Sequence, residues 1–266
     1  MPGVGVPGLL PPALHEGNHV TLLEGLLLSV GGLAAGFLNT IAGGGSVITI
    51  PILAGIVGPT VANGTLRISI LLQGIAGVAG FQHGDAVPWR AVLPLLLPTT
   101  AGAVGGAWVA TRVSAELMRT AFAIAVMLVA LSVLIRPSRW VGTSEPRLHE
   151  PWRSVTFTAI GFYGGFVQAG VGFPLLLALV PGLGLGLVRG NAAKNLLVLC
   201  HTPFVLLLFA RADQVNWYAG LVLGVASMVG ALVAALLAIR EGAARWIRWV
   251  VVLAAVAAAT QMLLSA

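Results

Sequence analysis

The sequence predicts an all-α polytopic membrane protein, and three observations support this fold class. The chain of 266 residues is 58% hydrophobic and only 8% charged, whereas soluble domains carry about 25% charged residues. Several of its apolar stretches reach the roughly 20 residues that a helix needs to cross a bilayer. Similar residues also recur in the two halves, as in many transporter folds. This composition excludes a soluble secreted enzyme.

Eight apolar segments are long enough to span a membrane. They cover residues 22–41, 63–83, 91–111, 118–136, 154–170, 191–210, 217–239 and 246–265. Two further segments, 46–58 and 173–187, are shorter and contain glycine and proline. Tryptophans lie at or just beyond the ends of the long segments, where their amphipathic rings prefer the membrane interface.

A polar connection divides the chain almost in half. It covers residues 137–153 and contains Arg139, Glu145, Arg147, His149 and Glu150. We expect it to join a first membrane repeat, 22–136, to a second, 154–266, after an N-terminal tail of residues 1–21.

The two halves share residues at a constant offset of 128 positions. The matching motifs are Asp85-x-Val87-x-Trp89 with Asp213-x-Val215-x-Trp217, Asn63 with Asn191, Gly102 with Gly230, and Arg112 with Arg240. We therefore predict two homologous halves, each with four long spans and one short broken helix.

The arginine positions favour inverted halves. If the short segments cross, each half has five crossings, and nine arginines face one side against three on the other, in keeping with the positive-inside tendency. If the short segments only re-enter, the division is six against six. An odd number of crossings inverts the second half relative to the first. Because 12–15 helical residues span only about 20 Å, the re-entrant course stays open as the alternative.

The clearest functional signal is an interruption in each half. Gly43, Gly44 and Gly45 follow Asn39 and precede Ser46 where a membrane helix should continue. The corresponding residues of the second half are Gln168, Gly170 and Gly172. Irregular backbone at membrane depth must line a cavity or be buried in protein, and paired breaks mark transporter binding sites. Close helix packing is the alternative role of such glycines, and we expect it for Gly32/Gly36, Gly102/Gly106, Gly161/Gly165 and Gly220/Gly224.

Each break is followed by a motif that contains a cation. The two motifs are Asn63-Gly64-Thr65-Leu66-Arg67 and Asn191-Ala192-Ala193-Lys194-Asn195. Asparagine is a favoured N-cap, so we expect a helix to begin at each motif. A cation is unfavourable at the positive end of a helix, which predicts a compensating anion bound by free N–H groups together with Arg67 or Lys194. The alternative is that these cations extend to lipid headgroups.

Other polar residues indicate little chemistry. His201 lies inside a span, where we expect it to bond a neighbouring helix, with a role as proton acceptor or gate as the alternative. No carboxylates follow one another through the spans, so a relay of acidic residues is not indicated. Enzyme motifs and metal-ligand spacings are absent. We therefore expect no catalytic residue, no metal, no cofactor and no nucleic-acid partner.

The first break also carries a family resemblance. Gly36-x-x-Asn39-x-x-Ala42-Gly43-Gly44-Gly45-Ser46 with Pro51, repeated in weaker form in the second half, resembles the TauE/SafE sulfite exporter family, also called TSUP. The resemblance covers residues 24–264 and implies a duplicated carrier of sulfite, sulfonates or related anions in a prokaryotic plasma (inner) membrane. It implies substrate contacts at Asn39, Gly43 to Ser46, Asn63 to Arg67, Gln168 to Gly172, and Asn191 to Asn195. The second-half glycine run is incomplete, so we expect unequal half-sites.

These observations predict a secondary transporter of small sulfur-containing anions, which bind between the broken helices of the two halves. An anion channel on the same repeats and a membrane-embedded scaffold are the alternatives. The expected partners are the anion and membrane lipid, and a homo-oligomer is left open. If Arg67 binds the anion through its charge, Arg67→Gln weakens binding and leaves the protein folded.

Overall fold

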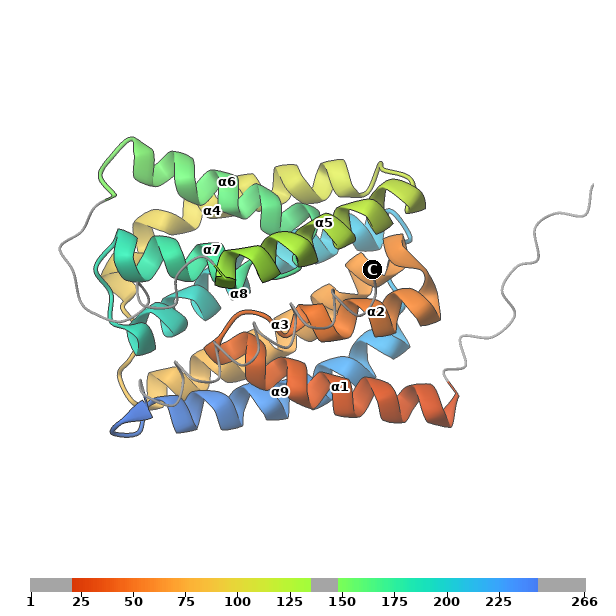
Figure 1. Ribbon diagram of the computed structural model, residues 1–266, viewed down its shortest axis with the longest axis horizontal. Helices are drawn as coiled ribbons and strands as arrows, with labels where there is room; N and C mark the ends of the chain where they lie inside the picture. The colour runs from red at the N-terminus through yellow and green to blue at the C-terminus, as the bar shows by residue number, and fades with distance from the viewer. Residues whose placement is uncertain (1–20, 135–147, 244–266) are drawn as a thin grey trace, which may run out of the picture.

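The computed structural model describes residues 21–134 and 148–243, and regular structure within these ranges is helical. The first half forms α1 (Leu22–Ile41), α2 (Ser46–Val57), α3 (Pro59–His83), α4 (Trp89–Ala110) and α5 (Ala115–Leu134). The second half forms α6 (Trp152–Phe166), α7 (Gly172–Leu177), the π-helical η2 (Ala178–Gly182), α8 (Leu187–Arg211) and α9 (Trp217–Ala238). Most of these helices run along the long axis of one bundle (Figure 1).

Five described helices are long and apolar enough to cross a membrane: α1, α3, α4, α8 and α9. They match five of the eight predicted spans, so the prediction of a multi-pass helical membrane protein is confirmed. The predicted span 154–170 is wrong at its end, because α6 stops at Phe166 and the break follows. Helix α5 covers most of segment 118–136. Segment 246–265, most of the predicted linker and nearly all of the N-terminal tail lie outside the described residues.

Local sequence accounts for several helix ends. Thr21 and Glu24 form a capping box at the start of α1, in which each side chain bonds the other residue's backbone N–H. The Asn216 side chain caps α9 by accepting from Ala219 N at 3.0 Å. At α3, Pro59 occupies the first turn, where its missing N–H leaves no bond unmade.

Glycines allow two helix pairs to approach closely. A Cβ added at Gly36 of α1 would lie 2.0 Å from the carbonyl oxygen of Ser227 in α9. At Gly102 of α4 it would lie 2.0 Å from the oxygen of Thr158 in α6. The expectation that the spaced glycine pairs serve packing is therefore confirmed, because only a residue without Cβ fits these contacts.

Residues that match between the halves adopt matching local structure. Helices α3 and α8 each contain 25 residues, α4 and α9 each contain 22, and both pairs begin 128 positions apart. Asp85 and Asp213 precede α4 and α9 with φ angles of 50° and 53°, which few non-glycine residues adopt. The repeated motif thus specifies the same turn twice.

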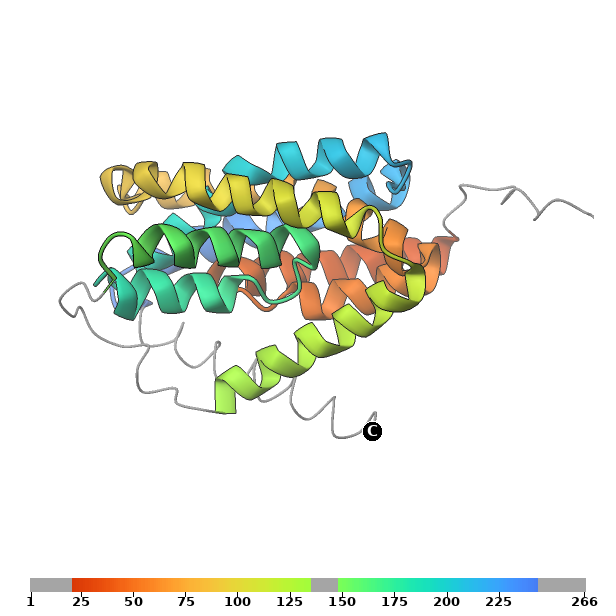
Figure 2. The same cartoon turned by 90° about the horizontal axis from the view of Figure 1, so that it is seen from above.

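The short helices turn back beside the helices that precede them. In Figure 1, α1 runs from right to left and α2 returns to the right. Figure 2 shows α6 running the opposite way and α7 returning to the left. The result is two helical hairpins that enter the bundle from opposite ends, with the breaks at their tips. Segments 46–58 and 173–187 correspond to α2 and to α7 with η2.

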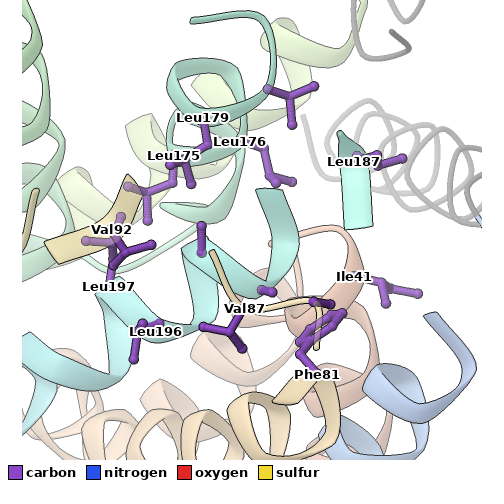
Figure 3. Close-up of a cluster of buried hydrophobic side chains, with 14 of the residues drawn as sticks. Ile41, Phe81, Val87, Val92, Leu175, Leu176, Leu179, Leu187, Leu196 and Leu197 are labelled. Carbon is purple, nitrogen blue, oxygen red and sulfur yellow. The ribbon is translucent and has the colours of Figure 1, made fainter. Parts of the chain in front are cut away.

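Buried apolar side chains form two clusters. One gathers around α7 and η2, and its members include Leu175, Leu176 and Leu179, which lie near Leu196 and Leu197 of α8 (Figure 3). The other gathers around α2 and includes Ile50, Leu53, Leu66, Val205 and Phe209. Each short helix is therefore held by an apolar core of its own.

Candidate functional site

The tips of the two hairpins cross at Gly43 and Gly172. A Cβ added at Gly172 would lie 2.2 Å from Gly43 Cα, and one added at Gly43 would lie 2.5 Å from Gly172 Cα. Gly43 also has a φ of 85°, which glycine adopts without strain. Gly43 and Gly172, which were both predicted to lie at the breaks, are therefore required to be glycine because the two backbones touch there.

Ser46 joins the two breaks by hydrogen bonds. Its hydroxyl accepts from Gly170 N at 3.0 Å and donates to the carbonyl oxygen of Gln168 at 3.5 Å. The backbone N–H of Ser46 donates to Asn39 Oδ1 at 3.4 Å. These contacts connect the start of α2 to the chain between α6 and α7, so the break residues of the two halves form one polar centre.

Arg67 closes the end of α6. Its guanidinium donates to the carbonyl oxygens of Gly164 and Gly165, both at 2.8 Å, and to Gln168 Oε1 at 2.6 Å. The two remaining N–H groups donate to the backbone and side-chain oxygens of Asn63 at 3.3 and 3.0 Å. All five guanidinium donors are thus occupied. A cation at the negative end of a helix is favourable, and this one binds carbonyls that a helix C-terminus leaves unpaired.

Lys194 binds the carbonyl oxygens at the end of α1 in the same way. Its ammonium donates to the carbonyl oxygens of Asn39 at 2.5 Å and Thr40 at 3.0 Å, and to Asn191 Oδ1 at 2.9 Å. Asn195 Nδ2 adds a bond to the Thr40 oxygen at 3.0 Å. Each half therefore supplies the cation that caps the broken helix of the other half.

Neither buried cation has an acidic partner among the described residues. Arg67 and Lys194 are 0% and 2% exposed, whereas the ion pair that occurs in the described ranges joins Arg153 to Glu150 at the start of α6. There, hydrogen bonding from Ser154 and the nearby Arg153 lower the pKa of the Glu150 carboxyl. A buried charge without an opposite charge is costly. Hydrogen bonds and helix dipoles offset part of this cost at Arg67 and Lys194, but the centre keeps a net positive charge.

The structure corrects the expected helix starts. Helices α3 and α8 begin at Pro59 and Leu187, so Asn63 and Asn191 lie one turn inside them and are not N-caps. The prediction of an anion site made of free N–H groups at these two positions is therefore wrong. Four side chains of the motifs instead bind the opposite hairpin: Asn63, Arg67, Lys194 and Asn195. Asn63 Nδ2, for example, donates at 2.8 Å to the carbonyl oxygen of Phe166, the last residue of α6.

A small cavity lies where the hairpin tips meet. Its volume is about 20 Å³, which is room for about one water molecule. The lining residues are Asn39, Gly43, Ile70, Gln73, Gln168, Val171, Gly172, Lys194, Asn195 and Val198. Both breaks, α3 and α8 contribute to this wall, which combines amide groups, an ammonium group and apolar surface.

The cavity wall includes some predicted site residues and not others. Six predicted residues line it: Asn39, Gly43, Gln168, Gly172, Lys194 and Asn195. Gly44, Gly45, Ser46 and Gly170 lie in the breaks beside it. Asn63 and Arg67 bind the end of α6, and Asn191 accepts from Lys194. Thr65 is directed elsewhere, since its hydroxyl accepts from Asn216 N at 2.8 Å.

Two buried polar residues were missed or misjudged from the sequence. Gln73 lines the cavity, is 5% exposed, and its Oε1 has no partner among the described residues. His201 is 1% exposed, and both ring nitrogens likewise lack a described partner, so the expected bond to a neighbouring helix is not formed. The sequence did contain a signal for this pair. Gln73 and His201 are both polar and lie 128 positions apart, which is the offset between the two halves.

Comparison with known families decides the membership of the chain. Residues 28–262 match the family model described as sulfite exporter TauE/SafE. The chain belongs to the TauE/SafE family. This confirms the resemblance seen in the first break. The TauE/SafE match covers the first hairpin from residue 28 onward, the whole second hairpin, the cavity and both capping cations.

Several proteins to which this TauE/SafE chain is similar are named as transporters. It is 29% identical over 239 residues to "Probable membrane transporter protein ORF9" of a Sinorhizobium species, covering 89% of this chain and 91% of the relative. It is 29% identical over 223 residues to "Probable membrane transporter protein YfcA" of Escherichia coli K12, covering 83% and 82%. A Haemophilus influenzae protein of similar name is 25% identical over 213 residues, covering 79% and 84%. No solved structure gives a significant match.

Proposed function

We propose that this protein is a secondary transporter of small sulfur-containing anions, such as sulfite or an organosulfonate, in a prokaryotic plasma membrane. The anion binds at the cavity between the hairpin tips. The family description and the bacterial relatives support this substrate class and this membrane.

One observation carries the anion assignment. Lys194 is a fully buried cation on the cavity wall, with no carboxylate partner in the described ranges. Arg67, equally buried, lies behind the same wall and donates to Gln168, which lines it. Ionisable groups at membrane depth are costly and usually mark a functional site. A bound anion supplies the charge that the protein leaves uncompensated.

The contacts favour an electrostatic role for both cations. All five Arg67 donors and all three Lys194 donors bind protein oxygens. Each cation therefore acts on the anion through its charge, and Arg67 acts also through Gln168. Lys194 contacts the cavity, as do Asn195 and Gln73. Asn39 and Gln168 supply amide groups from the two breaks. The anion is thus bound mainly by amide groups on the cavity wall, while Lys194 on the wall and Arg67 behind it supply positive charge.

The small volume of the cavity favours a carrier over a channel. A volume of about 20 Å³ is too small for an oxyanion with three oxygens, so the anion enters only when the hairpins move apart. The two hairpins enter from opposite ends of the bundle, and the helices after them match at a constant offset. This arrangement supports inverted repeats, with halves at 22–136 and 154–266, in which alternate movements of the two halves expose the cavity to each face.

The test is a flux assay in proteoliposomes with sulfite, thiosulfate, sulfate, methanesulfonate and taurine, with and without a pH gradient. We expect saturable uptake of at least one sulfur anion by the wild type. Lys194→Gln should reduce that uptake, measured per amount of folded protein, about tenfold or more, because it removes the positive charge on the cavity wall; a tenfold loss corresponds to about 1.4 kcal/mol. Arg189→Gln is the control, because Arg189 is an exposed cation on the same helix.

Two outcomes contradict the proposal. If no anion in the panel moves, a scaffold role is favoured. If uptake does not saturate and proceeds at diffusion-like rates without a gradient, the protein is a channel built on the same hairpins.

A further inference from the structure

Gln73 and His201 occupy equivalent places in the two halves. They lie 128 positions apart, as do the starts of α3 and α8. Both side chains are buried, and both carry polar atoms without a partner among the described residues. Since buried polar groups are nearly always bonded, two such residues at matching positions of a repeat call for a common explanation.

Gln73 lines the cavity, and His201 does not. Three matched pairs line it together: Asn39 with Gln168, Gly43 with Gly172, and Ile70 with Val198. The cavity therefore lies where the two halves meet. Beyond these pairs it extends toward Gln73, Lys194 and Asn195, and not toward their counterparts His201, Leu66 and Arg67. The space is open on one side of the meeting point and closed on the other.

Ionisable and aromatic side chains lie on the closed side. His201 lies close enough to Arg67 to feel its charge, and the ring of Phe209 packs 5.3 Å from the Arg67 guanidinium carbon. An imidazole, a guanidinium and an aromatic ring are thus collected around His201 and Arg67, the counterparts of Gln73 and Asn195.

We infer that Gln73 and His201 line the anion path alternately, Gln73 in the state seen here and His201 in the opposite state. The inference rests on the proposed carrier function, and its reason is geometric. If two inverted halves exchange conformations, the surroundings of matched residues exchange as well. His201 then lines the cavity with both nitrogens free to bind the anion or water, and Gln73 becomes enclosed.

The exchange gives the two states different responses to pH, because histidine titrates near neutrality and glutamine does not. A proton taken from water by the His201 ring adds a positive charge beside the bound anion. The bound anion offsets that charge, so proton and anion bind together and cross together. Anion uptake through the His201 state should therefore rise as pH falls.

Few other charges face His201. Helix α8 packs against α1, α3, α4, α7 and η2, and from α3 it is Arg67 that acts on the imidazole. The remaining titratable side chains on these partner helices lie at helix ends: Glu24, His83 and Arg90. On α8 itself, Lys194 lies about two turns away, Cys200 is the sequence neighbour, and Arg189 and Arg211 lie at the two ends.

Cysteine accessibility tests the exchange without requiring transport. The chain has one cysteine, so Cys200→Ala gives a background for Gln73→Cys and His201→Cys. Each variant is treated in right-side-out and inverted vesicles with the impermeant reagent 2-sulfonatoethyl methanethiosulfonate, itself a small sulfonate. We expect Gln73→Cys to react from one face and His201→Cys from the opposite face, and methanesulfonate to slow both. Leu196→Cys, in the apolar cluster on the same helix, should not react.

The inference is overturned if His201→Cys is inert from both faces, or reacts from the same face as Gln73→Cys. These results do not depend on whether any anion is carried, whereas failure of wild-type flux across the panel contradicts the proposed function itself.

The pH arm uses His201→Gln, which places glutamine at both matched positions. We expect wild-type methanesulfonate uptake to rise several-fold from about pH 8 to about pH 6, the range in which histidine gains its proton. The variant should transport with a flat profile. Because methanesulfonate keeps one negative charge over this range, its own titration contributes nothing. A flat wild-type profile, or an unchanged slope in the variant, removes His201 from proton coupling.

Discussion

Gly43 and Gly172 touch backbone to backbone where two hairpins from opposite halves of the chain cross. Each lies within 2.2–2.5 Å of the position that a Cβ on the other would take. The two breaks therefore determine each other's position, and the polar centre around them exists only when both hairpins are in place.

Gly172→Ala should destabilise the protein by about 1–3 kcal/mol, the usual cost of overpacking. The added methyl group meets the Gly43 backbone, which cannot rotate away as a side chain could. Thermal unfolding of the detergent-solubilised protein measures the effect. Gly25→Ala is the matched control, because no atom lies within 4 Å of its added Cβ. Equal melting temperatures for the two variants would disprove the close contact.

Ser46→Ala should cost about 1–3 kcal/mol, because it leaves the buried N–H of Gly170 without its acceptor. Ser29→Ala removes a hydroxyl that only bonds the carbonyl of the preceding turn, so its effect should be small. Unfolding midpoints in a denaturant series compare the two. If Ser29→Ala is the more damaging change, the link between the breaks is unimportant.

Arg67→Gln should unfold or strongly destabilise the protein, unlike the purely functional effect that the sequence suggests. It removes the donors that bind the ends of α6 and leaves buried carbonyl oxygens unpaired, at about 1–3 kcal/mol for each unmet group. Arg67→Lys keeps the charge with three donors in place of five, so it should rescue stability only in part. Expression level and melting temperature should be highest for the wild type, lower for Arg67→Lys and lowest for Arg67→Gln. A fully stable Arg67→Gln protein would return Arg67 to a direct binding role.

Gln73→Leu should weaken anion binding while leaving stability unchanged or slightly higher. The side chain faces the cavity, and its Oε1 has no described partner to lose. Losing one bond to a bound anion predicts a rise in KM of about tenfold or more. Ile70→Leu on the same wall is the control, since volume and polarity are kept. An unaltered KM for Gln73→Leu would exclude the glutamine from the anion path.

Much of the helical layout could be predicted because it depends on local properties of the chain. Apolar length predicts a span, and a run of glycines beside polar residues predicts an interruption. The breaks at Gly43–Gly45 and at Gln168–Gly172 were therefore visible, and so was the repeated turn before Trp89 and Trp217. The error at the end of the span 154–170 has the same origin, since Phe166 and Val167 are both apolar and only the tertiary contacts end the helix between them.

The roles of the cations could not be predicted, because their partners are distant in the chain. Arg67 binds the carbonyl of Gly164, 97 residues away, and Lys194 binds that of Asn39, 155 residues away. A carbonyl oxygen belongs to every residue, so the identity of the acceptor leaves no mark in the sequence around the donor.

Local composition is thus sufficient for the membrane helices, their interruptions and the duplicated motif, since apolar burial and backbone flexibility act residue by residue. The crossing of the hairpin tips, the capping of each broken helix by the other half, and the cavity beside Lys194 required the folded chain. These features depend on hydrogen bonds and charges that meet only when segments far apart in sequence are brought together.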